Sequence, residues 1–423
     1  MFTRFILEKT PLILTQIDRD KNSLTYGDCD RNHWHLKTRD FSSAILQQSG
    51  LLLALLYKNN FPGNIYYNNI NMKKWAEATV KYWSNIQLKD GSFNEYYPNE
   101  HGFPPTAFSL YSSCEIYKIL ELEDTDILKK IKKTAYYLGK TIEAQACNQE
   151  MASITAMYSA YSITKDKEIY KMMDRKLIRI LSFQDDEGWF AEYGGGDIGY
   201  LSVTLDMMAE YYRLSGDDRV KKPLEKLLCF LMYFLHPNNT IGGEYGSRNT
   251  TYFLPNGLQI MSNMGYRNAE DMIEKLFNDN YGSDYFLNSV DDRYLSHYVT
   301  HSFMRALVNR KENKRSIFFQ YEDVKEFKNA GLVIVRKNNS YIVMGMHKGG
   351  IIKIFKDDKE IFTDCGYRVE LGKGKIAATN WQDNTYISKY DTDEWMVEGY
   401  MNKVYLQSST PFMHFGLRIV SLL

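Results

Sequence analysis

Three segments of the chain repeat a pattern that brings carboxylates and aromatic rings together. In each, a Glu-Tyr pair is followed by another aromatic residue eight positions after the glutamate. The pairs are Glu95-Tyr96, Glu192-Tyr193 and Glu244-Tyr245, and the later residues are Phe103, Tyr200 and Tyr252. Paired carboxylates can hydrolyse glycosidic bonds, and tyrosine combines an apolar face with a polar edge that suits a sugar ring. These segments are therefore candidates for a carbohydrate site.

The spacing of the three segments predicts an architecture. The glutamates are 97 and 52 residues apart, close to two units and one unit of a repeat of about 50 residues, which is typical of stacked helical units. Each segment follows one expected helix and precedes the next, so the loops fall at the same end of successive hairpins. Such hairpins can close into an α/α toroid whose loops line one shared cleft.

Repeated and variable residues favour different roles. A feature that recurs in every unit is usually architectural, which favours a capping role for the Glu-Tyr pairs. Substrate contacts by Glu95, Glu192, Glu244 and Tyr245 are the alternative. Residues that differ between the copies are better candidates for substrate contact. They are Asn99, Glu100 and His101 in the first loop, Asp197 and Tyr200 in the second, and Arg248, Asn249 and Tyr252 in the third.

Apolar residues at helical spacing predict the elements that position these loops. The expected helices cover residues 41–57, 72–86, 106–120, 127–143, 154–163, 168–183, 201–214 and 220–235. After residue 315 the pattern changes to short β-branched runs at 331–336, 340–346, 351–355 and 415–420, which are typical of antiparallel strands. We expect an N-terminal segment (1–38), an incomplete α/α toroid (39–312) and an antiparallel β-sandwich (316–423) that is truncated after its last apolar run.

The repeated segments resemble the loops of heparinase II/III-like proteins. The resemblance rests on DGSFNEYYPNEH (90–101), EGWFAEYGGGDIGY (187–200) and GEYGSRNTTY (243–252). Residues 348–355 and 364–367 are similar to the start of that family's β-sandwich. The resemblance covers most of the chain. It implies a toroid followed by a β-sandwich, and lyase activity on an acidic polysaccharide that contains uronic acid.

The resemblance also implies a β-elimination, with an amide against the uronate carboxylate and a tyrosine as base or acid. In the family the amide precedes the tyrosine by about one repeat, and Asn148 precedes Tyr200 by 52 residues. Gln149 follows Asn148 where many alginate and heparin lyases have a histidine, so the substrate stays open. Tyr200 is our choice for the base, provided that neighbouring cations lower its pKa from about 10. The candidates for the leaving-group acid are Tyr252 and His101.

Amide and guanidinium groups would stabilise the negative charge that forms beside the carboxylate during elimination. The candidates for these donors are Asn148, Gln149, Arg248 and Asn249. Arg248 has an alternative role as the structural partner of a nearby glutamate, because arginine pairs well with carboxylates.

Two further segments contain histidines. Residues 28–35 (DCDRNHWH) include His33, Trp34 and His35 just before the first expected helix. Their spacing matches no strong metal motif, so we expect no metal and predict another substrate-contacting loop of the cleft. His297 and His301 lie four residues apart, on one face of a helix, and we expect them near the cleft.

Composition limits the partners. The 423 residues include 52 basic and 52 acidic side chains, so the net charge of zero gives no reason to expect nucleic acid. No apolar run approaches the roughly 20 residues that span a bilayer. The five cysteines form no CxxC pair, and the N-terminus lacks the apolar stretch of a signal peptide, which predicts a cytoplasmic protein. No cofactor is expected.

Three other functions are compatible with the sequence. A glycoside hydrolase would use two of the loop carboxylates. A uronate C5-epimerase would begin with the same proton abstraction as a lyase. A non-catalytic glycan-binding protein of polysaccharide assembly would use only the aromatic and polar loop residues. All four functions place the sugar at the same loops, so the product formed from a polysaccharide is what distinguishes them.

Overall fold

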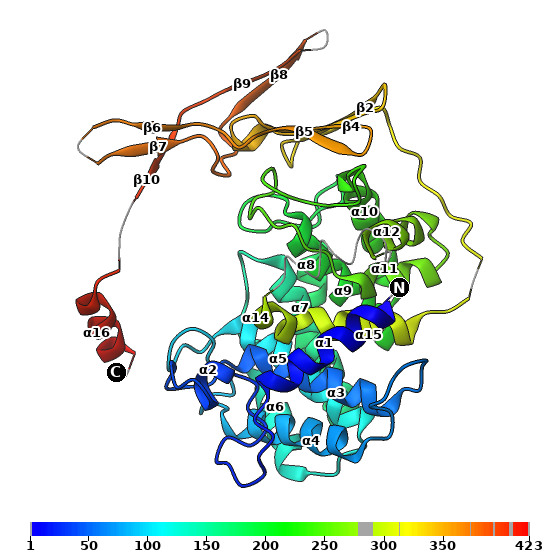
Figure 1. Ribbon diagram of the computed structural model, residues 1–423, viewed down its shortest axis with the longest axis vertical. Coiled ribbons are helices and arrows are strands. Elements are labelled where there is room, and N and C mark those ends of the chain that lie inside the picture. The colour runs from blue at the N-terminus through cyan, green and yellow to red at the C-terminus, as the bar shows by residue number, and fades with distance from the viewer. Residues whose placement is uncertain are drawn as a thin grey trace.

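The computed structural model describes residues 2–277, 291–312, 314–372, 374–391, 394–405 and 409–421. Helices form the first part of the chain and antiparallel sheets form the last part (Figure 1), which confirms the predicted fold class. Among the described residues, no helix is both long enough and apolar enough to cross a membrane.

An inner ring of helices forms the centre of the toroid. Within the described ranges its members are α3 (Ser49–Lys58), α5 (Phe103–Ile119), α7 (Cys147–Thr164), α9 (Ile198–Ser215), α11 (Pro255–Asn263) and α15 (Thr300–Asn309). Each packs against the next, and α15 packs against α3, so the described inner helices are arranged in a ring. Most residues of α7 and α9 are buried on every side, as expected for helices inside a domain.

An outer layer covers this ring. Its helices are α1 (Phe2–Gln16), α4 (Ile70–Asn85), α6 (Thr125–Lys140), α8 (Lys167–Leu181), α10 (Lys221–Leu231) and α12 (Arg267–Phe277). Each of α6, α8 and α12 buries an apolar face against the ring and exposes its polar face to solvent. The helix α1 falls in a segment where the sequence predicted no helix, and it packs against α15. The short helices are α2 (Arg31–Trp34), η1 (Ala44–Gln48), η2 (Asp218–Val220), η3 (Met232–Phe234), α14 (Asp292–Tyr294), η4 (Leu295–Val299) and η5 (Met346–Lys348).

The order of inner and outer helices determines where the loops meet. Successive inner helices from α3 to α11 are separated in the chain by one outer helix. These inner helices therefore run in the same direction, and their N-terminal ends lie at one end of the toroid. The Glu-Tyr segments come directly before α5, α9 and α11, so all three belong to this end.

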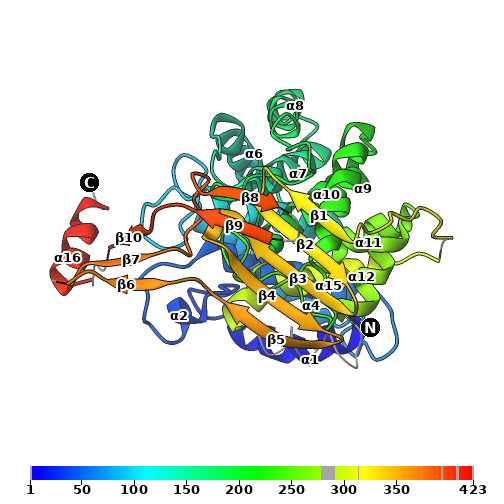
Figure 2. The ribbon, with the colours of Figure 1, turned by 90° about the horizontal axis from the view of Figure 1, so that it is seen from above.

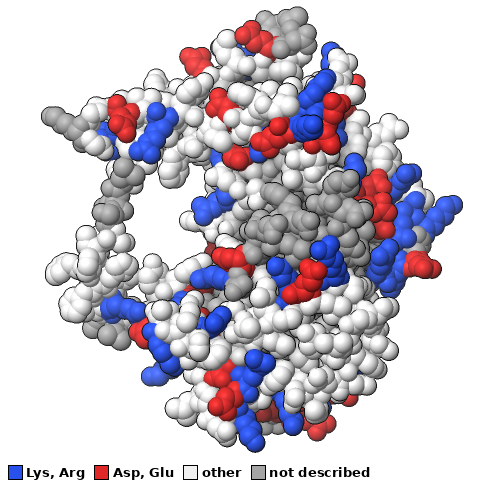
Figure 3. Space-filling model, viewed as in Figure 1, with Lys and Arg blue, Asp and Glu red and all other residues white. Residues whose placement is uncertain are grey.

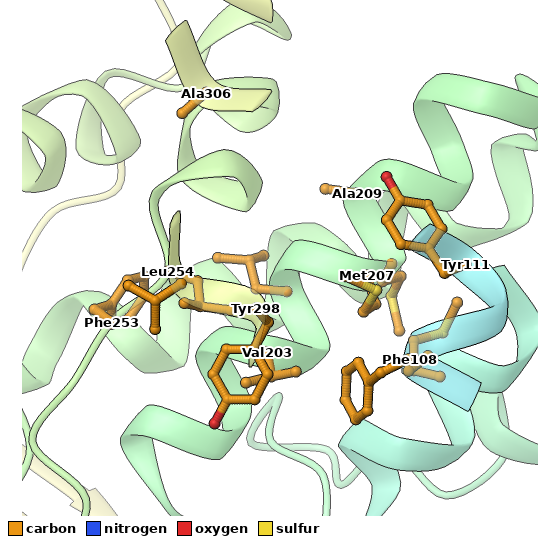
Figure 4. Packing of buried hydrophobic residues seen from close by; sticks show 14 of the residues in the cluster. Phe108, Tyr111, Val203, Met207, Ala209, Phe253, Leu254, Tyr298 and Ala306 are labelled. Carbon is orange, nitrogen blue, oxygen red and sulfur yellow. The ribbon is translucent and has the colours of Figure 1, made fainter. Parts of the chain in front are cut away.

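Apolar side chains fill the space between inner helices. Figure 4 shows Phe108 and Tyr111 of α5 facing Val203 and Met207 of α9, all of them buried. Tyr298 lies in the same cluster, and its ring centroid is 5.7 Å from that of Phe108. The core thus extends from the middle of the ring to its loop end.

The β domain contains three sheets. The five-stranded sheet has the order β1 (Val324–Phe327), β2 (Leu332–Lys337), β3 (Ser340–Gly345), β4 (Ile351–Lys356), β5 (Lys359–Asp364). A three-stranded sheet has the order β10 (Asn402–Val404), β7 (Ile376–Ala378), β6 (Arg368–Glu370), and β8 (Ile387–Asp391) pairs with β9 (Glu394–Glu398). The first three predicted strands correspond to β2, β3 and β4.

The fourth predicted strand was wrong. Residues 415–420 belong to the helix α16 (Pro411–Val420). Thr410 caps this helix, since its hydroxyl accepts a hydrogen bond of 3.2 Å from the Met413 N–H, and Pro411 occupies the first turn, where it needs no donor. The start signals of a helix override the apolar run that predicted a strand.

The β domain lies over the loop end of the toroid (Figures 1 and 2). Lys353 of β4 forms an ion pair of 3.1 Å with Glu244, and the Tyr341 hydroxyl donates to the Tyr233 carbonyl at 2.8 Å. Figure 3 shows an opening between the toroid and α16, and basic and acidic side chains are interspersed on this face. The loops that carry the Glu-Tyr segments therefore lie near the boundary of the two domains.

Candidate functional site

Four tyrosines form a continuous series at the loop end of the toroid. The ring centroid of Tyr200 is 6.1 Å from that of Tyr193 and 6.3 Å from that of Tyr252. The Tyr252 ring is 6.0 Å from Tyr298, whose hydroxyl donates to the Tyr252 oxygen at 3.1 Å. We call Tyr193, Tyr200, Tyr252 and Tyr298 the tyrosine row.

The buried carboxylate of Asp197 joins the second and third loops. As the N-cap of α9 it accepts the Tyr200 backbone N–H at 3.2 Å, and it also accepts the Arg248 backbone N–H at 2.9 Å. The Thr250 hydroxyl donates to the same carboxylate. Gly199 permits this approach, because a Cβ atom there would lie 2.3 Å from the Thr250 hydroxyl oxygen. Asp197 therefore holds Tyr200 and Arg248 together and is not itself available to a substrate.

The guanidinium group of Arg248 lies beside the row. Its central carbon is 4.5 Å from the Tyr193 ring centroid, an arrangement typical of a cation–π contact. The side chain is exposed, and no carboxylate among the described residues forms an ion pair with it. The predicted alternative, a structural partner for a Glu-Tyr glutamate, therefore has no support. An uncompensated guanidinium is well suited to bind a carboxylate in two hydrogen bonds.

The tyrosines of the row differ in acidity. Burial raises the pKa of Tyr200 to about 12, and Arg248 opposes that rise. The guanidinium lowers the pKa of Tyr200 by less than burial raises it, so the pKa stays above its usual value of about 10. Burial raises the pKa of Tyr252 well above its usual value, and the neighbouring Tyr298 adds to the rise. Tyr200 is thus the easier of these two phenols to ionise.

His297 lies at the far end of the row. It belongs to η4, a π-helical turn before α15, with non-helical backbone angles at φ −68° and ψ −112°. Its ring centroid is 5.7 Å from Tyr298, and its Nε2 atom is buried without a hydrogen-bond partner in the described part of the chain. Burial, with a smaller contribution from Arg293, lowers the pKa of His297 to about 3, so the imidazole is neutral at neutral pH.

The first loop reaches the segment before η4. The Glu95 carboxylate accepts from the Arg293 guanidinium at 2.8 Å, and that guanidinium lies 5.0 Å from the Tyr96 ring centroid. Burial raises the pKa of Glu95, although Arg293 acts in the opposite direction. Glu100 stabilises the loop, since it accepts the backbone N–H groups of Glu95 and Tyr96 at 2.6 and 2.8 Å.

Asn148 occupies a different environment from the one that the sequence predicted. Its backbone N–H and its side-chain amide donate to the two oxygens of Glu192, at 2.8 and 2.6 Å, and both residues are buried. Burial raises the pKa of Glu192 well above its usual range despite these bonds. The Asn148 amide is therefore engaged in holding the second loop. Gln149 lies closer to the row, because its amide donates to the Tyr193 hydroxyl at 3.3 Å.

Two other candidate substrate contacts, Tyr245 and His301, are buried in the core. The Tyr245 hydroxyl hydrogen-bonds to His236 at 2.9 Å, and the Tyr245 side chain is 1% exposed. His301 is fully buried and hydrogen-bonds to Gln48 at 3.2 Å. His301 also accepts a hydrogen bond from the Arg305 guanidinium at 3.3 Å, so both side chains are bound to buried polar partners.

The remaining candidate residues lie in the loops, and within the described part of the chain their side chains bind partners outside the tyrosine row. His101 pairs with Asp90 at 2.7 Å, and the Asn99 amide donates to the Ser421 carbonyl at 2.8 Å. Glu244 pairs with Lys353, while Asn249 accepts from Lys348. His33 pairs with the buried Asp28 at 2.6 Å, the Trp34 indole donates to the Gln16 carbonyl at 2.7 Å, and the exposed His35 ring lies 5.1 Å from that of Trp34. Among the described residues, no group of three or more His, Cys, Asp or Glu side chains is arranged to hold a metal.

Tyr298, Tyr193 and Arg293 were not among the candidate residues that the sequence indicated. Tyr298 lies in the sequence between His297 and His301, and its hydroxyl donates a hydrogen bond to the Tyr252 oxygen. Tyr193 is the second residue of a Glu-Tyr pair, to which the sequence assigned a capping role. The proximity of Tyr193 and Tyr298 to Tyr200 and Tyr252 depends on how the loops fold together, and the sequence gives no signal for it.

Comparison with solved structures gives the class of fold. A Paenibacillus xanthan lyase superposes with a TM-score of 0.55 at 10% sequence identity, over 93% of this chain and 43% of its own. The heparan sulfate lyase HepC from Pedobacter heparinus gives a TM-score of 0.45 at 12% identity, over 92% of this chain and 62% of its own. The likeness to the xanthan lyase shows a polysaccharide lyase-like fold. This chain spans less than two thirds of either protein's length. No family model and no curated protein matches the sequence.

We expect the substitution Asn148→Ala to lower the free energy of unfolding by about 1–3 kcal/mol, because it removes a buried hydrogen bond to a carboxylate. Gln149→Ala is the matched control, and its partly exposed position predicts a change within about 0.5 kcal/mol. Urea unfolding measures both. If Asn148→Ala is as stable as Gln149→Ala while turnover is lost, Asn148 acts on the substrate, as the sequence predicted.

Proposed function

We propose that the protein is a polysaccharide lyase, of the heparinase II/III-like type, that cleaves a uronic-acid-containing polysaccharide by β-elimination. The observation that supports this proposal most is the uncompensated Arg248 guanidinium beside Tyr200. A carboxylate of the sugar would complete the ion pair that Arg248 lacks among the described residues. The same contact would bring the carbon next to that carboxylate toward the tyrosine row.

The proposed reaction uses two tyrosines. The Tyr200 phenolate removes the proton from C5 of the uronate while Arg248 stabilises the charge that develops on the carboxylate. The electron pair of the C5–H bond forms the C4=C5 double bond, and the bond between C4 and the glycosidic oxygen breaks. The Tyr252 hydroxyl donates its proton to that leaving oxygen.

The surroundings of Tyr200 and Tyr252 support the roles of base and acid proposed for them. A base must lose its proton and an acid must retain it, and sites of this kind separate the pKa values of their titratable groups. Tyr200, with a pKa of about 12, lies beside a cation and at the N-terminal end of α9, both of which favour the phenolate. Tyr252 is held protonated by its burial and by its phenolic neighbours.

The loop end of the toroid favours an anionic substrate. The N-terminal ends of inner helices meet there, and helix N-termini carry partial positive charge that attracts anions. The side chains of Arg248 and Arg293 lie at the same end, although Arg293 is already paired with Glu95.

The carboxylates of this region give little support to a glycoside hydrolase. Each candidate already has a partner: Glu95 binds Arg293, Glu100 and Asp197 bind backbone N–H groups, Glu192 binds Asn148, and Glu244 binds Lys353. A hydrolase needs two carboxyl groups that face the scissile bond. An epimerase or a binding protein would differ from a lyase in its product, and the next experiment distinguishes them.

The direct test is a panel of alginate, polygalacturonate, xanthan and heparan sulfate, followed by ultraviolet absorbance of the unsaturated product. We expect Tyr200→Phe to lower kcat by about 10²- to 10⁴-fold, since it removes the proton-transfer group. Tyr170→Phe, on the outer helix α8, is the control and should retain full activity.

Three results would contradict the proposal. Retained activity in Tyr200→Phe would exclude the phenol from the reaction. New reducing ends without an unsaturated product would indicate a hydrolase. Exchange of solvent deuterium into C5 without shortening of the polymer would indicate an epimerase.

The pH dependence provides an independent prediction. Because the pKa of Tyr200 is about 12, the phenolate fraction increases about tenfold per pH unit below that value. We therefore expect kcat/KM to rise with a slope near one, on logarithmic axes, from about pH 7 to about pH 10. Initial rates in buffers of constant ionic strength measure this slope. A plateau or a decline before about pH 9 would show that the base is a group with a lower pKa.

A further inference from the structure

A cavity lies in the β domain, away from the tyrosine row. Its volume is about 360 Å³, within the range of about 300–1,000 Å³ that is usual for small-ligand sites. Residues of β1, β2 and the turn between them form one side, and the β8–β9 hairpin forms the other. The residues that matter for its chemistry are Lys328, Met346, Ser388, Lys389, Tyr390 and Trp395.

A stacked pair of aromatic rings lines this cavity. Tyr390 and Trp395 are directly opposite each other in the hairpin, and their ring centroids are 4.6 Å apart at 28° between the planes. Trp395 packs against the buried cluster of Val333, Met344 and Met346, whereas Tyr390 is 52% exposed. The pair is thus fixed against the sheet on one side and accessible on the other.

The indole N–H of Trp395 is left without a hydrogen-bond partner by the residues that the structure describes. Its Nε1 atom is buried and makes no hydrogen bond within the described residues. Tryptophan usually finds a hydrogen-bond partner when it is buried, because an unsatisfied donor costs free energy. A ligand with both an apolar face and hydroxyl or ring oxygens would satisfy the ring pair and the donor together. Sugar rings have this combination.

The charges around the cavity favour an acidic sugar. Lys328 is 3.8 Å from the Glu326 carboxylate, which partly neutralises it. Lys389 lines the cavity and forms no ion pair in the part of the chain that the structure describes. One uncompensated ammonium group is therefore available to a carboxylate.

We propose that this cavity is a second saccharide-binding site, in which a sugar ring of an acidic polysaccharide stacks on the exposed face of Tyr390, which Trp395 supports from behind, while Lys389 faces a carboxylate. The identity of the polymer rests on the proposed function, whereas the binding of a sugar rests on the cavity alone. The site shares no residue with the tyrosine row, so it would hold the polymer and raise its local concentration without taking part in the elimination.

Affinity electrophoresis of the full chain tests this proposal, in gels that contain alginate, polygalacturonate, xanthan or heparan sulfate. We expect at least one polymer to retard the wild-type protein and Trp395→Ala to weaken that retardation at least threefold. Trp381→Ala is the matched control, because Trp381 is an exposed tryptophan of the same domain that does not line this cavity. On an oligosaccharide too short to reach the cavity, Trp395→Ala should leave kcat unchanged.

Two further variants separate binding from folding. Trp395→Phe preserves a ring against Tyr390 but removes the N–H, so we expect about 2- to 10-fold weaker retardation with an unchanged melting temperature. Lys389→Ala should weaken binding to the acidic polymers, and added salt should reduce the difference from wild type.

The outcomes distinguish this inference from the proposed function. Equal retardation of wild type and both Trp395 variants, or no retardation of wild type by any polymer, overturns the second site. Retardation that depends on Trp395 without unsaturated product supports the second site and contradicts the lyase. Unsaturated product together with retardation that does not depend on Trp395 supports the lyase and contradicts the second site.

Discussion

A buried network of charged groups holds the inner ring in one arrangement. Arg305 of α15 donates to Asp206 of α9 at 2.6 Å, and its guanidinium also lies 3.7 Å from Glu210. Glu210 accepts from the Tyr111 hydroxyl of α5 at 2.8 Å and from the Asn256 amide of α11 at 3.3 Å. Buried charges are costly unless they are paired, so α5, α9, α11 and α15 must meet in one register. That register places the loop ends of these helices side by side.

The site depends on the β domain although its proposed catalytic side chains come from the toroid. The Lys348 ammonium donates to the carbonyls of Glu244 and Gly246, both at 2.8 Å, and to the Asn249 side chain. Burial lowers the pKa of Lys348 to about 8, and nearby carboxylates oppose that shift. Lys348 and Asp197 thus hold the same loop from opposite domains, and that loop carries Arg248. The Arg248 guanidinium, which forms no ion pair within the described residues, stays beside Tyr200 because its loop is bound from both domains.

The sequence predicted the parts of this molecule that follow from local spacing. Apolar periodicity predicted the helices from α3 to α10, and the repeated Glu-Tyr segments predicted that their loops share one end. It also selected Tyr200, Arg248 and Tyr252, which the structure brings together. It did not predict which polar groups would meet inside. Asn148 is bound to Glu192, and His301 is part of the core, because burial and pairing depend on contacts between distant segments. Tyr298 was not predicted for the same reason. The helix α16 was not predicted because a capping threonine and a proline override the apolar run that indicated a strand.

The most direct measurement is a crystal structure of Tyr200→Phe with a uronate oligosaccharide bound. The proposed mechanism predicts that a sugar carboxylate lies within hydrogen-bond distance of the Arg248 guanidinium and that C5 of the same sugar faces the ring of residue 200. An oligosaccharide bound elsewhere, or one whose carboxylates leave Arg248 unpaired, would contradict the proposed role of the tyrosine row and leave only the fold.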